Sequence, residues 1–243
     1  MMPIRIHHFN TVTSTNDVAL DMARVGAPEG SIVLARSQSA GRGRQGRAWL
    51  DEPGACVLMS AIVRPALPQE RVYEISFVAS AAVAGILESR FGLEPALKWP
   101  NDVLVHGRKI GGILIEAQST GAVVIGIGLN VNQRHFPPQI KDTATSVAIE
   151  TGSTYDTVAV GECAAQVLME QYRDYLKRGF EEILSHWRKY MWGVGREASV
   201  ETDGRNIRGT ILGVDSSGAL LVREPLGKTH AVYSADAVRL LSM

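Results

Sequence analysis

The chain of 243 residues has no excess of charge of either sign, because 25 Lys and Arg residues balance 25 Asp and Glu residues. Broad binding to nucleic acid or to a membrane surface needs a net cationic face, so neither is expected. Long hydrophobic runs are missing too. The longest, Phe77 to Leu87, contains Ser80 and is far shorter than the ~20 residues of a membrane span. The N-terminal residues lack the apolar segment of a signal peptide.

Cysteine and histidine are scarce. Cys56 and Cys163 lie far apart in apolar surroundings, which predicts buried thiols rather than a disulfide. The six histidines show no metal-ligand spacing, since the adjacent pair His7–His8 cannot chelate a metal in the usual i, i+4 manner. Apolar residues make up 45% and charged residues 21% of the chain. This composition is typical of a globular enzyme, and we expect a cytoplasmic one without a metal site built by the protein.

One stretch, residues 38–49, combines glycine and arginine in an unusual density, and we call it the arginine loop. Its sequence is QSAGRGRQGRAW, and no carboxylate occurs between Glu29 and Asp51. Glycine lets a backbone take positive φ and approach a ligand closely, and guanidinium groups suit carboxylate and phosphate oxygens. The loop is therefore predicted to hold an anion. The alternative is a solvated basic loop with no ligand.

Two nucleotide-binding motifs are matched only superficially. Gly41, Gly43 and Gly46 satisfy G-x-G-x-x-G, but a dinucleotide site needs a helix to begin there and an acidic residue about twenty positions on. Residues 48–54 are typical of a turn instead, and Arg64-Pro65 occupy the acidic position. Gly227-Lys228-Thr229 resembles the end of a P-loop, yet Val222 replaces its first glycine. Both motifs are rejected.

Hydrophobic periodicity predicts alternating strands and helices in the first 192 residues. Ser14 with Asp17 resembles a capping box before a helix that ends near Gly26. Tight turns between residues 97 and 129 indicate an antiparallel meander. The predicted strands are 4–9, 32–36, 54–64, 103–105, 109–116 and 122–129. The predicted longer helices are 69–91 and 155–177, and a shorter helix is predicted at 180–192.

The chain changes character at Gly193, where short apolar runs separated by Gly and Asp turns begin. Five strands are predicted, at residues 197–200, 208–214, 219–223, 229–233 and 238–241. This cadence is typical of a small β barrel. We therefore expect two domains, residues 1–192 and residues 193–243.

Five motifs in this order, followed by the β-rich tail, resemble the biotin–protein ligase family over essentially the whole chain. They are Ser14-Thr15-Asn16, the arginine loop from Gln38 to Trp49, Lys98-Trp99-Pro100-Asn101-Asp102, Lys109-Ile110-Gly111-Gly112 and Gly126-Ile127-Gly128-Leu129-Asn130. The resemblance implies an α+β fold with a mixed, largely antiparallel sheet flanked by helices, related to class II synthetases and lipoate ligases. It also implies an SH3-like C-terminal β barrel.

The implied reaction has two steps. The carboxylate of biotin attacks the α-phosphorus of ATP, giving biotinyl-5′-adenylate and pyrophosphate, and a lysine of a biotin carboxyl carrier domain then takes the biotinyl group. Joining two anions requires positioned cations, for which Arg42, Arg44 and Lys109 are suited, with Mg²⁺ expected on the phosphates. Arg44 and Lys109 are the predicted catalytic residues.

The resemblance also assigns binding residues. Those predicted to contact biotin or its adenylate are Ser14, Thr15, Asn16, Gln38, Arg42, Gly43, Arg44, Lys109, Gly111 and Gly112. Those predicted to contact ATP and Mg²⁺ are Asn101, Asp102 and Asn130.

Simpler roles are available for several of these side chains. Residues 14–16 can serve only as a helix cap, Lys109 can be an exposed hairpin lysine, and Lys98 an ordinary strand lysine. Trp49 and Trp99 are either core aromatics or walls of the ligand site, and the sequence does not decide between these roles.

Two other functions remain open at the level of the sequence. One is lipoate or octanoate ligation on the same fold, and the other is a non-catalytic biotin-binding regulator. The intact arginine loop and the Lys98–Asp102 segment favour biotin, and the cationic positions favour catalysis. Some relatives carry an N-terminal DNA-binding domain, for which Ser14 leaves no room, so we expect a monofunctional ligase that does not bind DNA. A homodimer is expected by analogy, and the carrier protein is not identified.

Overall fold

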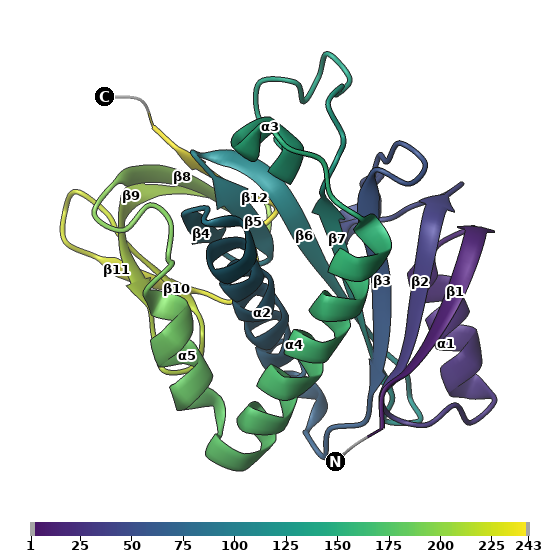
Figure 1. The fold of residues 1–243 in the computed structure, drawn as a ribbon. Helices are drawn as coiled ribbons and strands as arrows, with labels where there is room; N and C mark the ends of the chain where they lie inside the picture. The colour runs from purple at the N-terminus through teal and green to yellow at the C-terminus, as the bar shows by residue number, and fades with distance from the viewer. Residues whose placement is uncertain (1–2, 242–243) are drawn as a thin grey trace.

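The computed structural model describes residues 3–241. Its main body is a seven-stranded sheet in the order β1-β2-β3-β7-β6-β5-β4 (Figure 1). Within the described chain, β1 and β2 are the one parallel pair of strands and every other pair is antiparallel. The mixed, largely antiparallel sheet is thus confirmed. The strands are β1 (Arg5–Val12), β2 (Ser31–Gln38), β3 (Cys56–Val63), β4 (Pro95–Lys98), β5 (Asp102–Val105), β6 (Arg108–Ala117) and β7 (Val123–Asn130).

Helices cover both faces of this sheet (Figure 1). Successive side chains of a strand point to opposite faces, and β2 shows the result: Ile32 packs in the core under α2 and α4, whereas Val33 packs with Ala19 of α1. The helices are α1 (Thr15–Arg24), α2 (Glu74–Phe91), α3 (Val147–Thr151), α4 (Thr157–Arg178) and α5 (Phe180–Arg188). The face covered by α1 is the one that carries the site described below.

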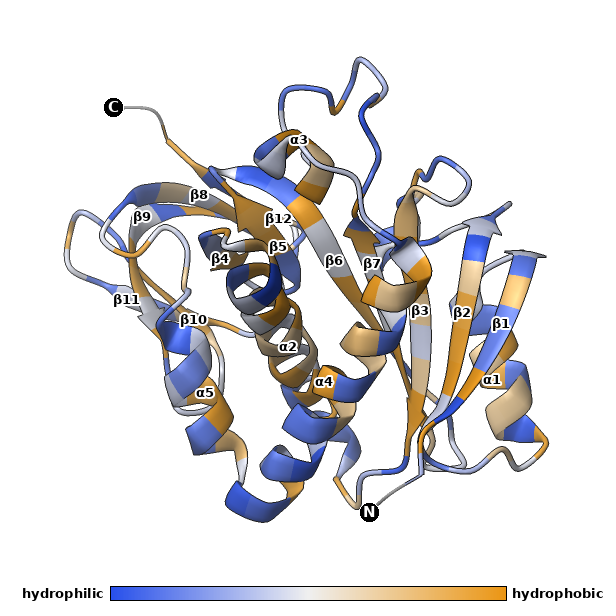
Figure 2. Ribbon diagram, viewed as in Figure 1, coloured by the Kyte–Doolittle hydropathy of each residue, from blue (hydrophilic) through white to orange (hydrophobic). Residues whose placement is uncertain are grey.

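Helix α2 is the apolar centre of the body. Together with the short turn that precedes it, Gln69–Phe91 is long and apolar enough to cross a membrane by length and composition, but 67% of its most apolar window is buried inside the protein. Its apolar side chains pack against the sheet and α4, and hydrophobic colours run along most of its ribbon in Figure 2. A helix that is apolar on all sides is typical of a core position. It ends at Gly92, whose φ is 64°.

Three local predictions were wrong in detail. The side chain of Ser14 caps α1 by accepting from the Asn16 amide, but the expected partner Asp17 binds Arg42 instead. Helix α3 lies in a segment for which no helix or strand was predicted. Helix α5 stops at Arg188 because Tyr190 and Trp192 hydrogen-bond to Leu97 of β4, at 2.7 and 3.0 Å.

The C-terminal residues form a second, antiparallel sheet in the order β11-β10-β9-β8-β12. Its strands are β8 (Glu197–Thr202), β9 (Arg205–Val214), β10 (Leu220–Arg223), β11 (Thr229–Val232) and β12 (Ala237–Leu240). All five predicted strands are present. In the part of the chain that the structure describes, β11 and β12 are the two edges and do not pair with each other, so the strands form an open sheet and the predicted closed barrel is not seen.

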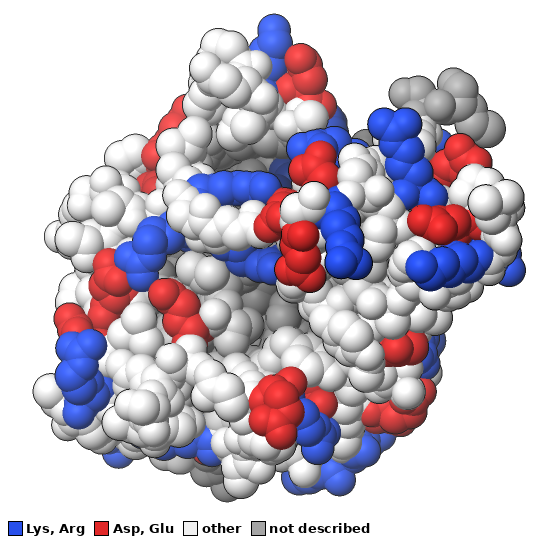
Figure 3. Space-filling model, turned by 180° about the vertical axis from the view of Figure 1, so that it is seen from behind, with Lys and Arg blue, Asp and Glu red and all other residues white. Residues whose placement is uncertain are grey.

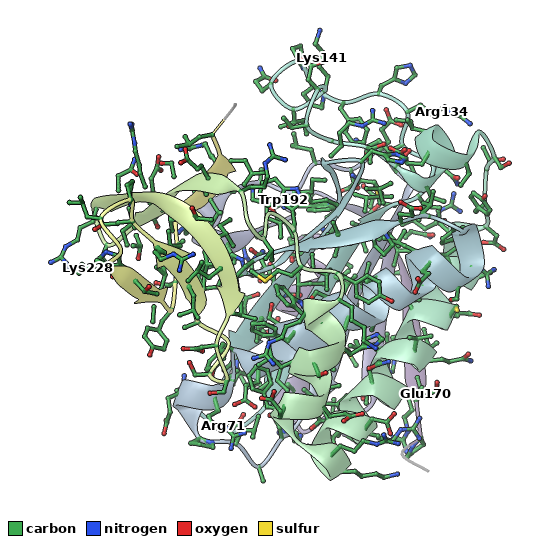
Figure 4. The ribbon with its side chains drawn as sticks, turned by 90° about the vertical axis from the view of Figure 1, so that its left-hand side faces the viewer. Arg71, Arg134, Lys141, Glu170, Trp192 and Lys228 are labelled. Atoms are coloured by element: carbon green, nitrogen blue, oxygen red, sulfur yellow. The ribbon has the colours of Figure 1, made fainter. Side chains whose placement is uncertain are left out.

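The turn between β9 and β10 fixes the C-terminal sheet to the main body. Trp99 is 4% exposed and donates from Nε1 to the carbonyl oxygen of Gly218 at 3.0 Å. A Cβ on Gly218 would lie 3.0 Å from the ring of Phe77. Trp192 lies where the two sheets meet (Figure 4). Trp99 is therefore chiefly a core aromatic that anchors the second sheet.

Candidate active site

A cleft of about 480 Å³ opens on the α1 face of the large sheet. Its floor is formed by β6 and β7, and its walls come from the arginine loop, the Lys98–Asp102 segment and residues 235–239 of the C-terminal sheet. Figure 3 shows this face hollowed, with Lys and Arg side chains around the opening. The volume is that of a site for a small organic ligand.

The floor is deep because β7 places two glycines on this face. Gly126, Gly128 and Asn130 alternate with the buried Ile125, Ile127 and Leu129 that face the core. A Cβ on Gly126 would lie 2.3 Å from the side-chain oxygen of Asn16, and a Cβ on Gly128 would lie 2.6 Å from the ring of Trp49. Trp49 therefore lies across the floor as a wall of the cleft. Its buried Nε1 has no hydrogen-bond partner among the described residues.

Gly128→Ala is expected to lower the affinity for the ligand about tenfold or more, because the new methyl group would force the Trp49 ring into the cleft. The measurement is the dissociation constant for biotin by calorimetry, with the melting temperature as a check on the fold. Gly85→Ala is the control for glycine replacement, since Gly85 lies within α2, has no positive φ and has nothing within 4 Å of an added Cβ. Unchanged affinity in Gly128→Ala would show that Trp49 moves freely.

The predicted residues at the start of α1 and the end of β2 meet at one end of this floor. Thr15 donates to the Gln38 Oε1 atom from both its amide, at 2.8 Å, and its hydroxyl, at 3.1 Å. Asn16 accepts from Ser60 at 2.6 Å and donates to Glu116 at 2.6 Å. Ser14 caps the helix, whereas Thr15 and Asn16 bond across the sheet face. A helix cap is thus only part of what this triplet does.

Arg42 is already paired with acidic side chains. Its guanidinium lies 2.6 Å from Asp17 and 3.4 Å from Glu116. The hydrogen bond from Arg42 lowers the pKa of the Asp17 carboxyl below its usual value. The charge of Arg42 is therefore compensated within the protein, and its main effect is to tie the arginine loop to α1 and β6.

Arg44 has a different environment, although it is only two residues away. Its one side-chain hydrogen bond among the described residues goes to the Asn101 Oδ1 atom at 3.4 Å, and it makes no ion pair there. Burial, with the nearby Arg47 charge, lowers the pKa of this guanidinium from its usual value. A partly desolvated cation without a carboxylate partner favours an anionic ligand. Arg44 is the strongest candidate for an anion-binding group.

Two lysines complete the cationic wall. Lys109 lies 2.5 Å from Asp102 and 5.8 Å from the centre of the Trp49 ring, and its side chain lines the cleft. Lys98 also lines the cleft, and its ammonium lies 5.2 Å from the ring centre of Trp192. Burial lowers the pKa of Lys98 below its usual value. Lys98 is therefore more than an ordinary strand lysine.

The backbone of the arginine loop only partly follows the prediction. Among its three glycines, positive φ occurs at Gly46 alone, at 70°, and the neighbouring Gln45 also has a positive φ of 56°. Gly41 is needed for close packing, since its Cβ would lie 2.8 Å from Gln38. The loop folds back on itself, with a 2.7 Å hydrogen bond from the Gly43 amide to the Arg47 carbonyl.

Of the remaining predicted residues, Gly43, Asn101, Asp102, Gly112 and Asn130 line the cleft, whereas Gly111 does not. Asn101 and Asp102 form its edge, and Asn130 donates from Nδ2 to the Thr145 carbonyl at 3.0 Å. Gly111 faces β7, where a Cβ would lie 3.1 Å from the Gly128 carbonyl, and a Cβ on Gly112 would lie 3.2 Å from the Lys109 side chain. No cluster of three or more His, Cys, Asp or Glu residues suited to a metal ion occurs within residues 3–241.

Sequence reasoning missed two residues that support the cleft through hydrogen bonds to Asn16, which are Glu116 and Ser60, and several residues that line it. Glu116 follows Gly112 and Leu114 at strand spacing, so the period of two was a signal for it. Ser60 is buried in the apolar strand β3. A polar residue in an apolar run indicates a buried hydrogen bond, so it could have been predicted as well. Nothing local marked the residues contributed by the loop after β7 and by the C-terminal sheet, which are Phe136, Ile140, Ala144 and 235–239.

Comparison with known proteins agrees with this geometry. Residues 8–132 match the biotin/lipoate A/B protein ligase family, and residues 193–240 match the biotin protein ligase C-terminal domain. The chain therefore belongs to the biotin/lipoate A/B protein ligase family.

The relatives of this chain include proteins named as biotin ligases. The bifunctional ligase/repressor BirA of Bacillus subtilis is 38% identical over 237 residues, covering 95% of this chain and 72% of that protein. The biotin–[acetyl-CoA-carboxylase] ligase of Paracoccus denitrificans is 34% identical over 224 residues, covering 88% and 92%. The structure of the biotin protein ligase from Aquifex aeolicus in complex with biotin and ATP has a TM-score of 0.88 and 27% identity, covering 98% of this chain and 99% of that chain.

Proposed function

We propose that the cleft is the place where this chain joins biotin to ATP and from which it transfers the biotinyl group. The chain is an ATP-dependent biotin–protein ligase: it activates biotin and passes it to a protein lysine. The observation that best supports placing the reaction in this cleft is the position of Arg44. It is a partly buried cation without a carboxylate partner among the described residues, and it lies at a cleft whose floor contains glycines without side chains.

The residues divide the work by position. Thr15, Asn16 and Gln38 offer fixed hydrogen-bonding groups at the α1 end, suited to the polar ring system of biotin, while Trp49 and the glycines of β7 enclose its apolar chain. Arg44 and Lys109 then face the point where the biotin carboxylate meets the α-phosphorus. Their charges offset the repulsion between the two anions in the first step. In the second step the lysine amine attacks the acyl carbon, and AMP leaves.

The other predicted contacts have supporting or structural positions. Arg42, Gly43, Gly111 and Gly112 shape the loop and the floor, and Ser14 orients the α1 end. On the ATP side we place Asn101, Asp102 and Asn130. A Mg²⁺ ion would be carried on the phosphates, because Mg²⁺ commonly uses only one or two protein carboxylates. Asp102 is the carboxylate at the cleft that fits this role, and the ion would neutralise phosphate charge.

The finer features of the assembly are also part of the proposal. The C-terminal sheet is proposed to be an SH3-like unit, supported by its five short antiparallel strands, with the boundary near Gly193. The acceptor is proposed to be the carrier domain of a biotin-dependent carboxylase.

A homodimer would use β1, because β4 is covered by residues 190–192 and β1 is an open edge. The free thiols fit a cytoplasmic location, and the zero net charge argues against DNA binding.

The test is ATP–pyrophosphate exchange with the purified protein. We expect exchange that depends on biotin and is absent with lipoate or octanoate at the same concentration. Exchange with lipoate alone would replace biotin by lipoate as the substrate. Biotin binding without any exchange, with Mg²⁺ and ATP present, would instead indicate the non-catalytic regulator.

A further inference from the structure

Asp236, which directly precedes β12 of the C-terminal sheet, forms hydrogen bonds with the tip of the arginine loop. The Gln45 side-chain amide donates to the Asp236 carboxylate, and the Arg47 guanidinium donates to the Asp236 carbonyl oxygen at 2.7 Å. These two residues flank Gly46 at the turn of the loop. The loop tip is thus held from a segment about 190 positions away in the sequence.

Asp236 is itself held firmly by the C-terminal sheet. Its amide donates to the Glu201 carbonyl of β8 at 2.7 Å, and it lies between Ala235 and Val238, which are 6% and 4% exposed. The sheet in turn is fixed to the main body by the turn at Gly218. The loop tip therefore contacts a rigid support rather than a mobile tail.

The backbone of the loop tip needs such a support. Gln45 has a φ of 56°, a region that non-glycine residues seldom occupy, apart from Asn, Asp and His. The hydrogen bond from its side chain to Asp236 favours this conformation over the alternatives. The Asp236 carboxylate also raises the pKa of Arg44, against the lowering effect of burial and of Arg47. It thus offsets part of the repulsion between two arginines of the loop.

We propose that Asp236 is a positioning residue that latches the arginine loop closed over the cleft. The purpose of the latch would be to retain the activated intermediate until the acceptor lysine arrives, and this purpose rests on the proposed function. The contact itself is exposed on both sides, so the latch is weak. A weak latch suits a loop that has to open for each round of binding.

The direct test is limited trypsin digestion of the ligand-free protein, because Arg42, Arg44 and Arg47 are cleavage sites within the loop. We expect Asp236→Ala to be cut there about five- to tenfold faster than the parent, which is the effect of losing one exposed charge-assisted hydrogen bond. Asp236→Asn should stay close to the parent, since its side-chain oxygen still accepts from Gln45. Glu197→Ala, an exposed carboxylate of the same sheet, is the control and should not differ.

Gln45→Ala breaks the same contact from the loop side and covers the case in which Asp236→Ala fails to fold. It should also be cut faster, and the double variant should be cut no faster than the single ones. Cutting at the parental rate in both single variants would overturn the latch. So would equal acceleration in Glu197→Ala.

Labelling of a bystander protein with biotin and ATP present then tests the purpose of the latch. We expect albumin to be biotinylated about five- to tenfold more by Asp236→Ala than by the parent. No increase, with exchange activity intact, would show that the latch does not retain the intermediate. Trypsin digestion does not depend on enzyme activity. A parent protein without biotin-dependent exchange would therefore overturn the proposed function, and the digestion rates would still test the latch.

Discussion

Arg44→Gly is expected to form biotinyl-adenylate but to release it about ten- to a hundredfold faster than the parent. Arg44 is the one arginine of the loop that is partly buried in the cleft and has only an amide oxygen as a side-chain partner among the described residues. Its hydrogen bond to an anionic adenylate would be charge-assisted and would contribute ~1.5–3 kcal/mol. That range corresponds to the expected acceleration, and glycine also loosens the loop.

The measurement is streptavidin blotting of albumin after incubation with biotin and ATP. The adenylate is a reactive mixed anhydride, which lysines of any nearby protein attack once it leaves the site. Arg44→Lys keeps the charge without the planar fork and should leak to an intermediate extent. Arg134→Gly, in another exposed loop (Figure 4), should not leak. If albumin stays unlabelled with an Arg44→Gly protein that still makes the adenylate, Arg44 does not retain the intermediate.

Lys109→Ala is expected to lower pyrophosphate exchange about a hundredfold while the melting temperature changes little. The substitution removes a cation from the cleft and leaves Asp102 without the ammonium that pairs with it at 2.5 Å. Both effects oppose the approach of two anions. Lys109 is more than a third exposed and contributes little to the core, so the fold should persist.

The control for that experiment is Lys141→Ala, an exposed lysine in the loop after β7 (Figure 4), which should exchange at the parental rate. A large drop in melting temperature for Lys109→Ala would assign the lysine a structural role. Normal exchange with a normal melting temperature would mean that the carboxylate and the phosphate meet elsewhere.

The sequence alone identified the strands other than β4, the longer helices and most segments that line the cleft. These features depend on local signals: apolar runs for β2 and β7, apolar residues at steps of three and four along α2, and the Ser14 cap of α1. A sequence pattern predicts an element correctly when the interactions that form this element join residues only a few positions apart. The order of the motifs was equally informative, because it indicated a family that the matches over residues 8–132 and 193–240 then confirmed.

Only the tertiary structure assigned separate roles to residues that look alike in the sequence. Arg42 and Arg44 have almost the same neighbours, yet Arg42 meets Glu116, 74 positions away, and Arg44 meets the cleft. Trp49 became a wall and Trp99 an anchor because Gly128 faces one ring and Gly218 accepts from the other. A charge or a ring has the same chemistry wherever it lies in the sequence. Its role depends on the partner that folding places beside it, and such partners come from distant strands and from the second sheet.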